Sequence, residues 1–421
     1  MTETMHKFLD CGAELAVCHM PDRRAQAIQI RMIAGFAHEP PDRLGVAHLT
    51  QQTADKGTNA YDGRALHDAF DAIGASHSSW CGREAAGFTA LCLPEYTERT
   101  IELHAEMLRR PVFADEACDV AVELARQDLL VLEDDPQALA DKLIARQAYG
   151  PVLGRHVGGE QDTLESMSAD DIRRFFRENY SAQRMQVSVV GPVPPDRVAG
   201  WFEQYFEGFG AGEPAGREHL AVRFDATMTH HDKTTEQEQI VLALPGVAVA
   251  DDAYPAQRIL LGVLSGSMSS RLFTEVREKR GLVYWVSAWS EHPRGAGMIF
   301  VGASTTPQRC DETYQTILAE LSRVGDDVSA DEVERALTGI AVRADIRGDI
   351  TRALCTQQAD DLTHRGRPVP WSEKLAQLEA VTVADVRGFC KAHLLMDQVS
   401  TVTLGPGALE RSTTTTQTAT P

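Results

Sequence analysis

The segment GVAHLTQQTADKGT, residues 45–58, opens with an apolar periodicity that predicts a helix over residues 44–54. Side chains four positions apart lie on one face of a helix, so we expect His48 and Gln52 side by side, with Gln51 next to them. Two histidines at that spacing can share a zinc ion, and a neighbouring glutamate can act as general base. Only one histidine is present in this segment, so the helix offers a single imidazole where a shared zinc ion needs two.

The same segment resembles the signature G-x-A-H-x-x-E-H…K-G-T of the pitrilysin or insulinase family of zinc peptidases, whose H-x-x-E-H is the inverzincin motif. Gln52 stands where the signature has its second imidazole, and an amide oxygen is a poor substitute for imidazole at zinc. Gln51 stands where the signature has its general base, and an amide cannot take a proton from the attacking water.

The resemblance also implies a third ligand, a glutamate ahead of a D-D-P element, and here Asp128 occupies that place with a shorter arm. An altered metal site built from His48 and Asp128 is one alternative. Catalytic zinc normally takes three protein ligands, so we expect no metal on this chain. The corresponding helix of the second half offers no substitute, because its matching positions are Ile259, Gly262 and Val263.

A second segment, SGSMSSRLFTEVREKRGLVY at residues 265–284, resembles the second-half signature of the same family. The resemblance implies that Arg277 and Tyr284 are catalytic and substrate-binding residues that reach across a chamber to a zinc-bearing half. A guanidinium can bind a substrate carbonyl, and a phenol can donate to a developing oxyanion. Spacing alone is more typical of a solvated helix charge at Arg277 and a strand core residue at Tyr284, and the resemblance reverses that preference. Arg280 is an alternative to Arg277.

Strand-like and helical patterns alternate along the chain, which predicts the α+β class. The strand-like runs are 27–34, 87–93, 185–193, 239–244, 297–303 and 399–404. The helical runs are 44–54, 64–73, 97–108, 115–132, 168–180, 253–264, 310–324 and 330–344.

A linker dense in Gly and Pro at 208–219 and a coarse internal repeat divide the chain into two halves. We expect an N-terminal peptidase-like domain over 1–210 with the degenerate zinc motif, a C-terminal one over 220–410 with the Arg/Tyr motif, and a disordered tail over 411–421. The resemblance implies that these two homologous mixed α/β-sheet domains form one half of a clamshell chamber.

The charge balance excludes some partners. With 61 acidic and 41 basic residues the formal net charge is −20, so we expect neither a nucleic-acid nor a membrane surface. The longest apolar stretch, 240–250, is too short to span a bilayer, and we see no secretory signal. The eight scattered cysteines are typical of reduced thiols, and we expect a cytoplasmic protein.

Together with the lost donors, the resemblance implies the inactive subunit of a heterodimeric zinc metalloendopeptidase. The resemblance implies a partner subunit with H-x-x-E-H that binds the zinc, and a peptide or small polypeptide as substrate. We expect no activity from this chain alone, since it binds no cofactor itself. The alternative is a non-proteolytic scaffold or peptide-binding subunit of the same fold, which would have no reason to keep both Arg277 and Tyr284.

Overall fold

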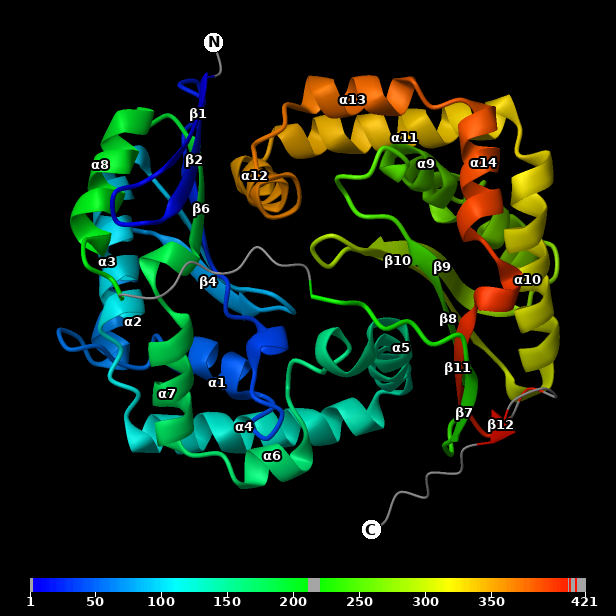
Figure 1. The fold of residues 1–421 in the computed structure, drawn as a ribbon, viewed down its shortest axis with the longest axis horizontal. Helices are drawn as coiled ribbons and strands as arrows, with labels where there is room; N and C mark the ends of the chain where they lie inside the picture. Colours follow the sequence, from blue (N-terminus) through cyan, green and yellow to red (C-terminus); the bar gives the residue numbers. More distant parts are fainter. Residues whose placement is uncertain (1–2, 211–219, 408, 410–412, 415–421) are drawn as a thin grey trace. The chain divides into compact units, whose positions relative to one another are not determined.

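Residues 3–210, 220–407, 409 and 413–414 are described by this computed structural model, drawn in Figure 1. They form two compact units. Unit 1 comprises 1–130, 155–218 and 346–369, and unit 2 comprises 131–154, 219–345 and 370–421. The predicted linker and tail lie outside the described residues except for 208–210, 413 and 414. The predicted domain boundaries therefore stay a prediction.

The sheet of unit 1 has the strand order β1-β2-β6-β3-β5-β4. Its strands are β1 (Glu3–Phe8), β2 (Glu14–His19), β3 (Gln26–Met32), β4 (Ser76–Cys81), β5 (Ala86–Cys92) and β6 (Met185–Gly191). Neighbouring strands are antiparallel except for β2 and β6, which are parallel. Strands β3 and β6 are buried along their whole length, so both faces of this sheet are covered at its centre.

The helices of unit 1 come mostly from the first half of the chain. They are α1 (Val46–Thr53), α2 (Gly63–Asp71), α3 (Thr97–Arg109), most of α4 (Asp115–Asp134), α6 (Gln161–Glu165), α7 (Ala169–Asn179), α8 (Pro195–Phe206) and α12 (Thr351–Arg365), with the short helices η1 (Phe36–His38), η2 (Pro94–Tyr96) and η3 (Ala182–Arg184). Helix α12 is the exception, because the second half of the chain contributes it to unit 1.

Hydrogen bonds dock α12 on the sheet beside a small apolar cluster in which Cys355 packs with Ala27 and Val190. Gln358 Nε2 donates to the carbonyl of Ala16 at 2.9 Å and to Ser188 Oγ at 3.0 Å. Ser188 Oγ donates in turn to the carbonyl of Cys355 at 2.8 Å. Each buried polar group thereby finds a partner, which avoids the cost of leaving it unsatisfied.

Unit 2 repeats the arrangement, with the strand order β12-β7-β11-β8-β10-β9. Its strands are β7 (Met228–Asp232), β8 (Glu238–Gly246), β9 (Val283–Glu291), β10 (Gly297–Thr305), β11 (Ser400–Gly405) and β12 (Thr413–Thr414). Its helices are α5 (Pro136–Leu153), α9 (Tyr254–Ser265), α10 (Cys310–Asp327), most of α11 (Ala330–Gly348), α13 (Trp371–Glu379) and α14 (Val383–His393), with the π-helical η4 (Phe273–Glu278) and the short helices η5 (Pro307–Arg309) and η6 (Met396–Gln398). Helix α5 is contributed by the first half and packs on β8 and β11.

The repeat extends to single residues. Gln26 begins β3 and accepts the backbone N–H of Val193 at 3.0 Å, while Glu238 begins β8 and accepts that of Gly407 at 3.0 Å. In each unit the strand beside it ends at a glycine with positive φ, 154° at Gly191 and 153° at Gly405. The internal repeat predicted from the sequence is therefore confirmed.

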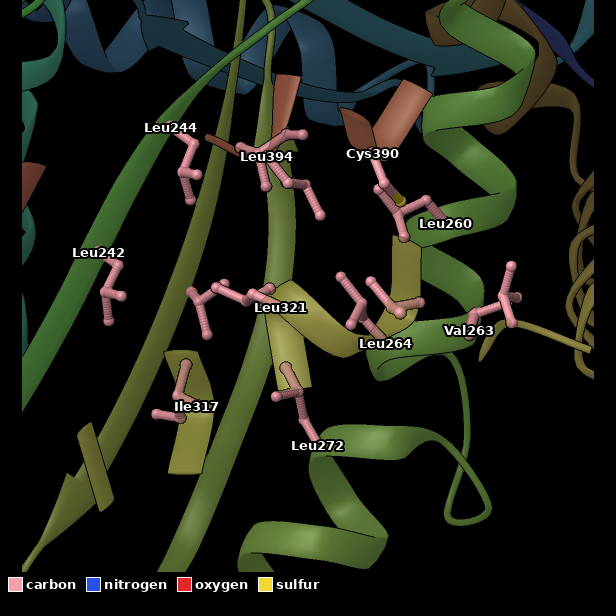
Figure 2. Packing of buried hydrophobic residues seen from close by; sticks show 14 of the residues in the cluster. Leu242, Leu244, Leu260, Val263, Leu264, Leu272, Ile317, Leu321, Cys390 and Leu394 are labelled. Carbon is pink, nitrogen blue, oxygen red and sulfur yellow. The ribbon is translucent and has the colours of Figure 1, made fainter. Parts of the chain in front are cut away.

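The core of unit 2 lies between β8 and the helices α9, α10 and α14, as Figure 2 shows. Leu242 and Leu244 of β8 point toward Leu260 and Leu264 of α9, and all four are fully buried. Burying one such side chain stabilises the fold by about 1.5–3 kcal/mol. The alternate residues of β8 are also buried, on the face toward which α5 packs.

All the predicted runs correspond to helices or strands, and the α+β class is confirmed. The helices α5, α6, α8, α12, α13 and α14, the edge strands β1, β4, β9 and β12, and the strands β2 and β7 were not predicted. Within the described residues, no helix is long and apolar enough to cross a membrane.

Candidate functional site

Helix α1 carries the degenerate metal motif, and a buried carboxylate holds its first turn. Glu39 Oε1 accepts the backbone N–H of Ala47 at 2.9 Å, which satisfies one of the free donors at the helix start. Burial raises the pKa of Glu39 to about 8. Gly45 precedes the helix with a φ of 98°, a conformation that glycine adopts without steric cost.

The structure brings His48 of α1 close to Asp128 of α4. Burial lowers the pKa of His48, and the negative charge of Asp128 acts in the opposite direction. The Nδ1 atom of His48 is buried and has no hydrogen-bond partner among the described residues. Asp128 is exposed. The two residues are neighbours, as expected for remnants of one site, but they provide only two donors.

Gln51 is buried, and its Nε2 donates to Ser79 Oγ of β4 at 2.6 Å. Its side chain is therefore used as a hydrogen-bond donor to the sheet edge, the opposite of what a general base does. Gln52 is half-buried on the same helix. Neither amide offers a zinc ligand comparable to imidazole or carboxylate.

Zinc does not fit this donor set. Catalytic zinc normally takes three protein ligands. In the parts of the chain that the structure describes, no group of three or more His, Cys, Asp or Glu side chains is arranged to hold a metal ion. The unpartnered Nδ1 of His48 is left as a single buried acceptor or donor.

A histidine-lined cavity of about 330 Å³ lies beside Gln51, with its partner Ser79 in the wall. His67 Nδ1 and His77 Nε2 are 3.2 Å apart, so one ring donates a hydrogen bond to the other. Asp55 Oδ2 lies 3.6 Å from His67 Nε2. Asp55, His67 and His77 thus form a chain of polar groups along the cavity.

The deepest imidazole of this cavity is that of His104. It is 1% exposed, and its Nδ1 donates to the carbonyl of Thr100 at 2.8 Å. Burial lowers the pKa of His104 to about 4. Burial also lowers the pKa of His77, and the neighbouring His67 lowers it further. Both rings are therefore neutral near pH 7.

The second predicted site lies entirely within unit 2, on η4 and β9. Segment η4 is a π-helix, in which the N–H of Lys279 donates to the carbonyl of Thr274, and such turns are frequent at functional sites. Arg277 belongs to η4, and its guanidinium carbon lies 4.8 Å from the ring centre of Phe273 and 5.1 Å from that of Tyr284.

Tyr284 is 80% exposed, which is unusual for a large aromatic residue. Its hydroxyl has no hydrogen-bond partner in the described part of the chain, and the Arg277 guanidinium there has ring contacts but no ion pair. Arg280 is placed differently, because its Nη1 binds the Glu275 carboxylate at 2.8 Å. The structure therefore brings Arg277, and not Arg280, together with Tyr284.

Tyr284 also borders a cavity of about 470 Å³. The cavity is lined by polar, acidic and aromatic side chains that include Asp135, Gln137, Glu236, Gln237, Tyr284 and Trp285. An exposed phenol, a guanidinium and an adjoining cavity can together bind a polar ligand such as a peptide carbonyl.

Sequence reasoning missed both cavities. His67, His77 and His104 come from α2, β4 and α3, with no spacing that a local motif would reveal. The walls of the cavity beside Tyr284 come from the start of α5, the connection between β7 and β8, and strands β8, β9 and β10. Of the residues singled out from the sequence, only Gln51 lies next to the first cavity, where the structure shows that it binds Ser79 of the wall.

Comparison with known families gives two matches that together cover most of the chain. Residues 15–160 match the family described as Insulinase (Peptidase family M16). Residues 166–340 match the family described as Peptidase M16 inactive domain. The first match contains His48 and Asp128, and the second contains Arg277 and Tyr284.

Similar proteins match nearly the full length. An uncharacterized zinc protease of Streptomyces coelicolor is 28% identical over 94% of this chain and 88% of its own length. The uncharacterized zinc protease YmxG of Bacillus subtilis is 26% identical over 90% and 93%, respectively. Among solved structures, a peptidase M16 inactive domain from Pseudomonas fluorescens has a TM-score of 0.90 at 19% identity, covering 97% of this chain and all of that one.

Proposed function

The chain belongs to the insulinase family of peptidases, family M16, and from that membership we propose that it is the non-zinc subunit of a two-chain metalloendopeptidase. Its partner is a homologous chain with an intact H-x-x-E-H motif, and its substrate is a peptide or small polypeptide. The observation that carries the proposal is the exposed pair of Arg277 and Tyr284 beside a cavity, in a chain whose own metal motif lacks its donors.

The degenerate motif supports the absence of activity from this chain alone. Gln51 donates to Ser79 instead of accepting a proton, and His48 has only Asp128 as a neighbouring donor from the motif. The zinc of the partner would supply the Lewis acid and the activated water. We assign neither task to a residue of this chain.

Arg277 and Tyr284 then bind and orient the substrate. The fork of the Arg277 guanidinium donates to a carbonyl of the peptide backbone and fixes its position. The Tyr284 hydroxyl donates to the oxygen on which negative charge develops when the carbonyl is attacked. The ring contact at 5.1 Å holds the two groups next to each other before substrate arrives, which limits the reorganisation that binding requires.

Reduced thiols support a cytoplasmic location for this pair. All eight cysteines are free, and burial raises the pKa of each, to about 11 at Cys118 and Cys390. Thiols in this state are the normal condition of a reducing compartment.

The test is peptide cleavage by this chain and an H-x-x-E-H partner, each alone and both together. We expect activity only from the pair. Tyr284→Phe and Arg277→Ala should each lower kcat/KM of the pair about 10²- to 10³-fold, because each removes a donor to the transition state. Arg280→Ala is the matched control, since it removes a nearby guanidinium that is held by Glu275.

Two outcomes would refute the composite site. One is a partner that is as active alone as in the pair. The other is unchanged turnover in Tyr284→Phe and Arg277→Ala when assembly is intact, which would favour the non-proteolytic scaffold. Assembly is measured separately by size-exclusion chromatography with light scattering.

A further inference from the structure

We propose that His67 of α2 and His77 of β4 form a binding site for one divalent transition-metal ion such as Zn²⁺, outside the degenerate motif of α1. The two imidazoles are its ligands from the described part of the chain, and water completes the coordination. The inference goes beyond the proposed function, because it concerns residues that take no part in binding the peptide.

The hydrogen bonds of the two rings leave one pair of nitrogens short of a proton. A neutral imidazole has one N–H and one lone pair. The outer nitrogen of His67, Nε2, lies 3.6 Å from Asp55 Oδ2, and the His77 ring has the carbonyl of Ala75 as an acceptor. When both N–H groups serve these acceptors, His67 Nδ1 and His77 Nε2 face each other with lone pairs at 3.2 Å. Without a metal, one ring can donate to the other only by giving up its outer acceptor, whereas a cation between them satisfies both rings.

The spacing of the two inner nitrogens matches that of two ligands of one ion. Zinc binds imidazole nitrogens at about 2.0–2.1 Å in tetrahedral geometry, which places two ligand nitrogens roughly 3.3 Å apart. The observed separation is 3.2 Å. The other nitrogen of a ligating histidine usually binds a carboxylate or a backbone carbonyl, and Asp55 and Ala75 provide one of each.

The surroundings hold one ring in place and leave the other accessible. The His77 ring stacks on Phe70 with ring centres 4.1 Å apart, and its burial keeps it neutral near pH 7, so that its lone pair is available. The side chain of His67 is 40% exposed, so an ion reaches the pair from solvent with a small rotation of this ring. Lys56 Nζ binds Asp55 Oδ1 at 2.9 Å, which leaves the other carboxylate oxygen toward His67. The adjoining cavity of about 330 Å³ has room for the water ligands.

The ligand type selects the class of ion. Imidazole favours Zn²⁺, Cu²⁺ and Ni²⁺, whereas Mg²⁺ and Ca²⁺ take oxygen ligands. Two imidazoles bind an ion more weakly than the three ligands of a catalytic zinc. The ion therefore exchanges during desalting and is detected by titration rather than in the purified chain.

The test titrates Zn²⁺ into the full chain without an affinity tag, after chelator treatment, by isothermal calorimetry. We expect one saturable ion per chain. His67→Gln and His77→Gln should each weaken its binding at least about tenfold, since even the loss of an outer partner of a ligating histidine costs that much. His393→Gln, which removes an imidazole from α14 in unit 2, is the matched control and should leave the affinity unchanged.

A second measurement identifies the ligands themselves. Electron spin-echo spectroscopy with Cu²⁺ in place of Zn²⁺ counts coordinated imidazoles, and we expect two in the wild type and one or none in His67→Gln. Absence of saturable binding up to millimolar zinc, or binding that His67→Gln leaves unchanged, overturns the site. Because His67 is partly exposed, this variant decides the question even if His77→Gln fails to fold. Neither outcome affects the composite site, which is judged by turnover of the pair.

Discussion

We expect acid to weaken the fold of unit 1 through His104. This imidazole is fully buried, packs edge-on against Phe70 with ring centres 5.1 Å apart, and uses its Nδ1–H for the carbonyl of Thr100. Adding a second proton would place a charge in a buried site that is shielded from solvent. Burial accordingly lowers the pKa of His104 from 6.5 to about 4.

The direction and the size of the pH effect on stability follow from this shift in the pKa of His104. Between pH 6.5 and pH 4 the unfolded chain holds the proton and the folded chain does not, so stability falls as the pH is lowered through that window. The free energy of unfolding should lose about 2 kcal/mol between pH 7.5 and pH 5 from this group alone. The full loss, reached below pH 4, is about 3.4 kcal/mol at 1.36 kcal/mol per pKa unit.

The assay is urea unfolding at pH 7.5 and pH 5 for the wild type and His104→Gln. Other buried groups also titrate, and Glu39, with a pKa raised to about 8, acts in the opposite direction. The difference between the two proteins removes those contributions. We expect the wild type to lose about 2 kcal/mol more than the variant, whereas Phe70→Leu, which alters the same packing without titrating, should cost the same at both pH values. Equal losses in wild type and His104→Gln would refute the account.

Three further outcomes are expected. Gln52→His combined with Asp128→Glu should bind about one zinc per chain by metal analysis, because it restores the third ligand, whereas Gln52→Ala with Asp128→Glu should not. Arg271→Ala should lower the free energy of unfolding by about 3 kcal/mol, since Arg271 is 8% exposed and binds both oxygens of Glu332, at 2.7 and 2.8 Å. Leu264→Ala should cost about 2–5 kcal/mol in chemical unfolding through a cavity in the core of unit 2, whereas Tyr284→Phe should cost under about 0.5 kcal/mol because its hydroxyl is exposed.

The helices and strands that could be predicted are those whose buried face is apolar, so that apolar residues recur at a regular spacing in the sequence. Helix α9 places Leu260, Val263 and Leu264 on one buried face, and its apolar spacing reveals it. Helix α12 buries Gln358 and Asp361 as well as Cys355 and Leu362, so its docking face has no apolar period. The edge strand β4 is mostly exposed and rich in serine, which hides it in the same way.

The same distinction applies to the candidate site, because some of its features follow from the local sequence and others do not. The loss of metal donors at Gln51 and Gln52 can be read from residue types and a helical spacing, because donors four positions apart meet whatever the rest of the fold does. The hydrogen bond from Gln51 to Ser79 cannot be predicted in this way, since it joins α1 to β4 across 28 positions of the chain. The contact between Arg277 and Tyr284 is an intermediate case. The resemblance indicated the two residues, whereas only the structure shows that Arg277 lies against Tyr284 from the π-helical turn while Arg280 is paired with Glu275.

By itself, then, the sequence determined the class of fold and the internal repeat, since both depend on local patterns, and its resemblance to the family's motifs indicated the family and the missing zinc ligands. Only the tertiary structure decided that α5 and α12 each pack in the unit of the opposite half, that three distant histidines line one cavity, and that Tyr284 borders another. These features arise from contacts between residues far apart in the chain. Such contacts depend on which surfaces meet after folding, and no local period records them.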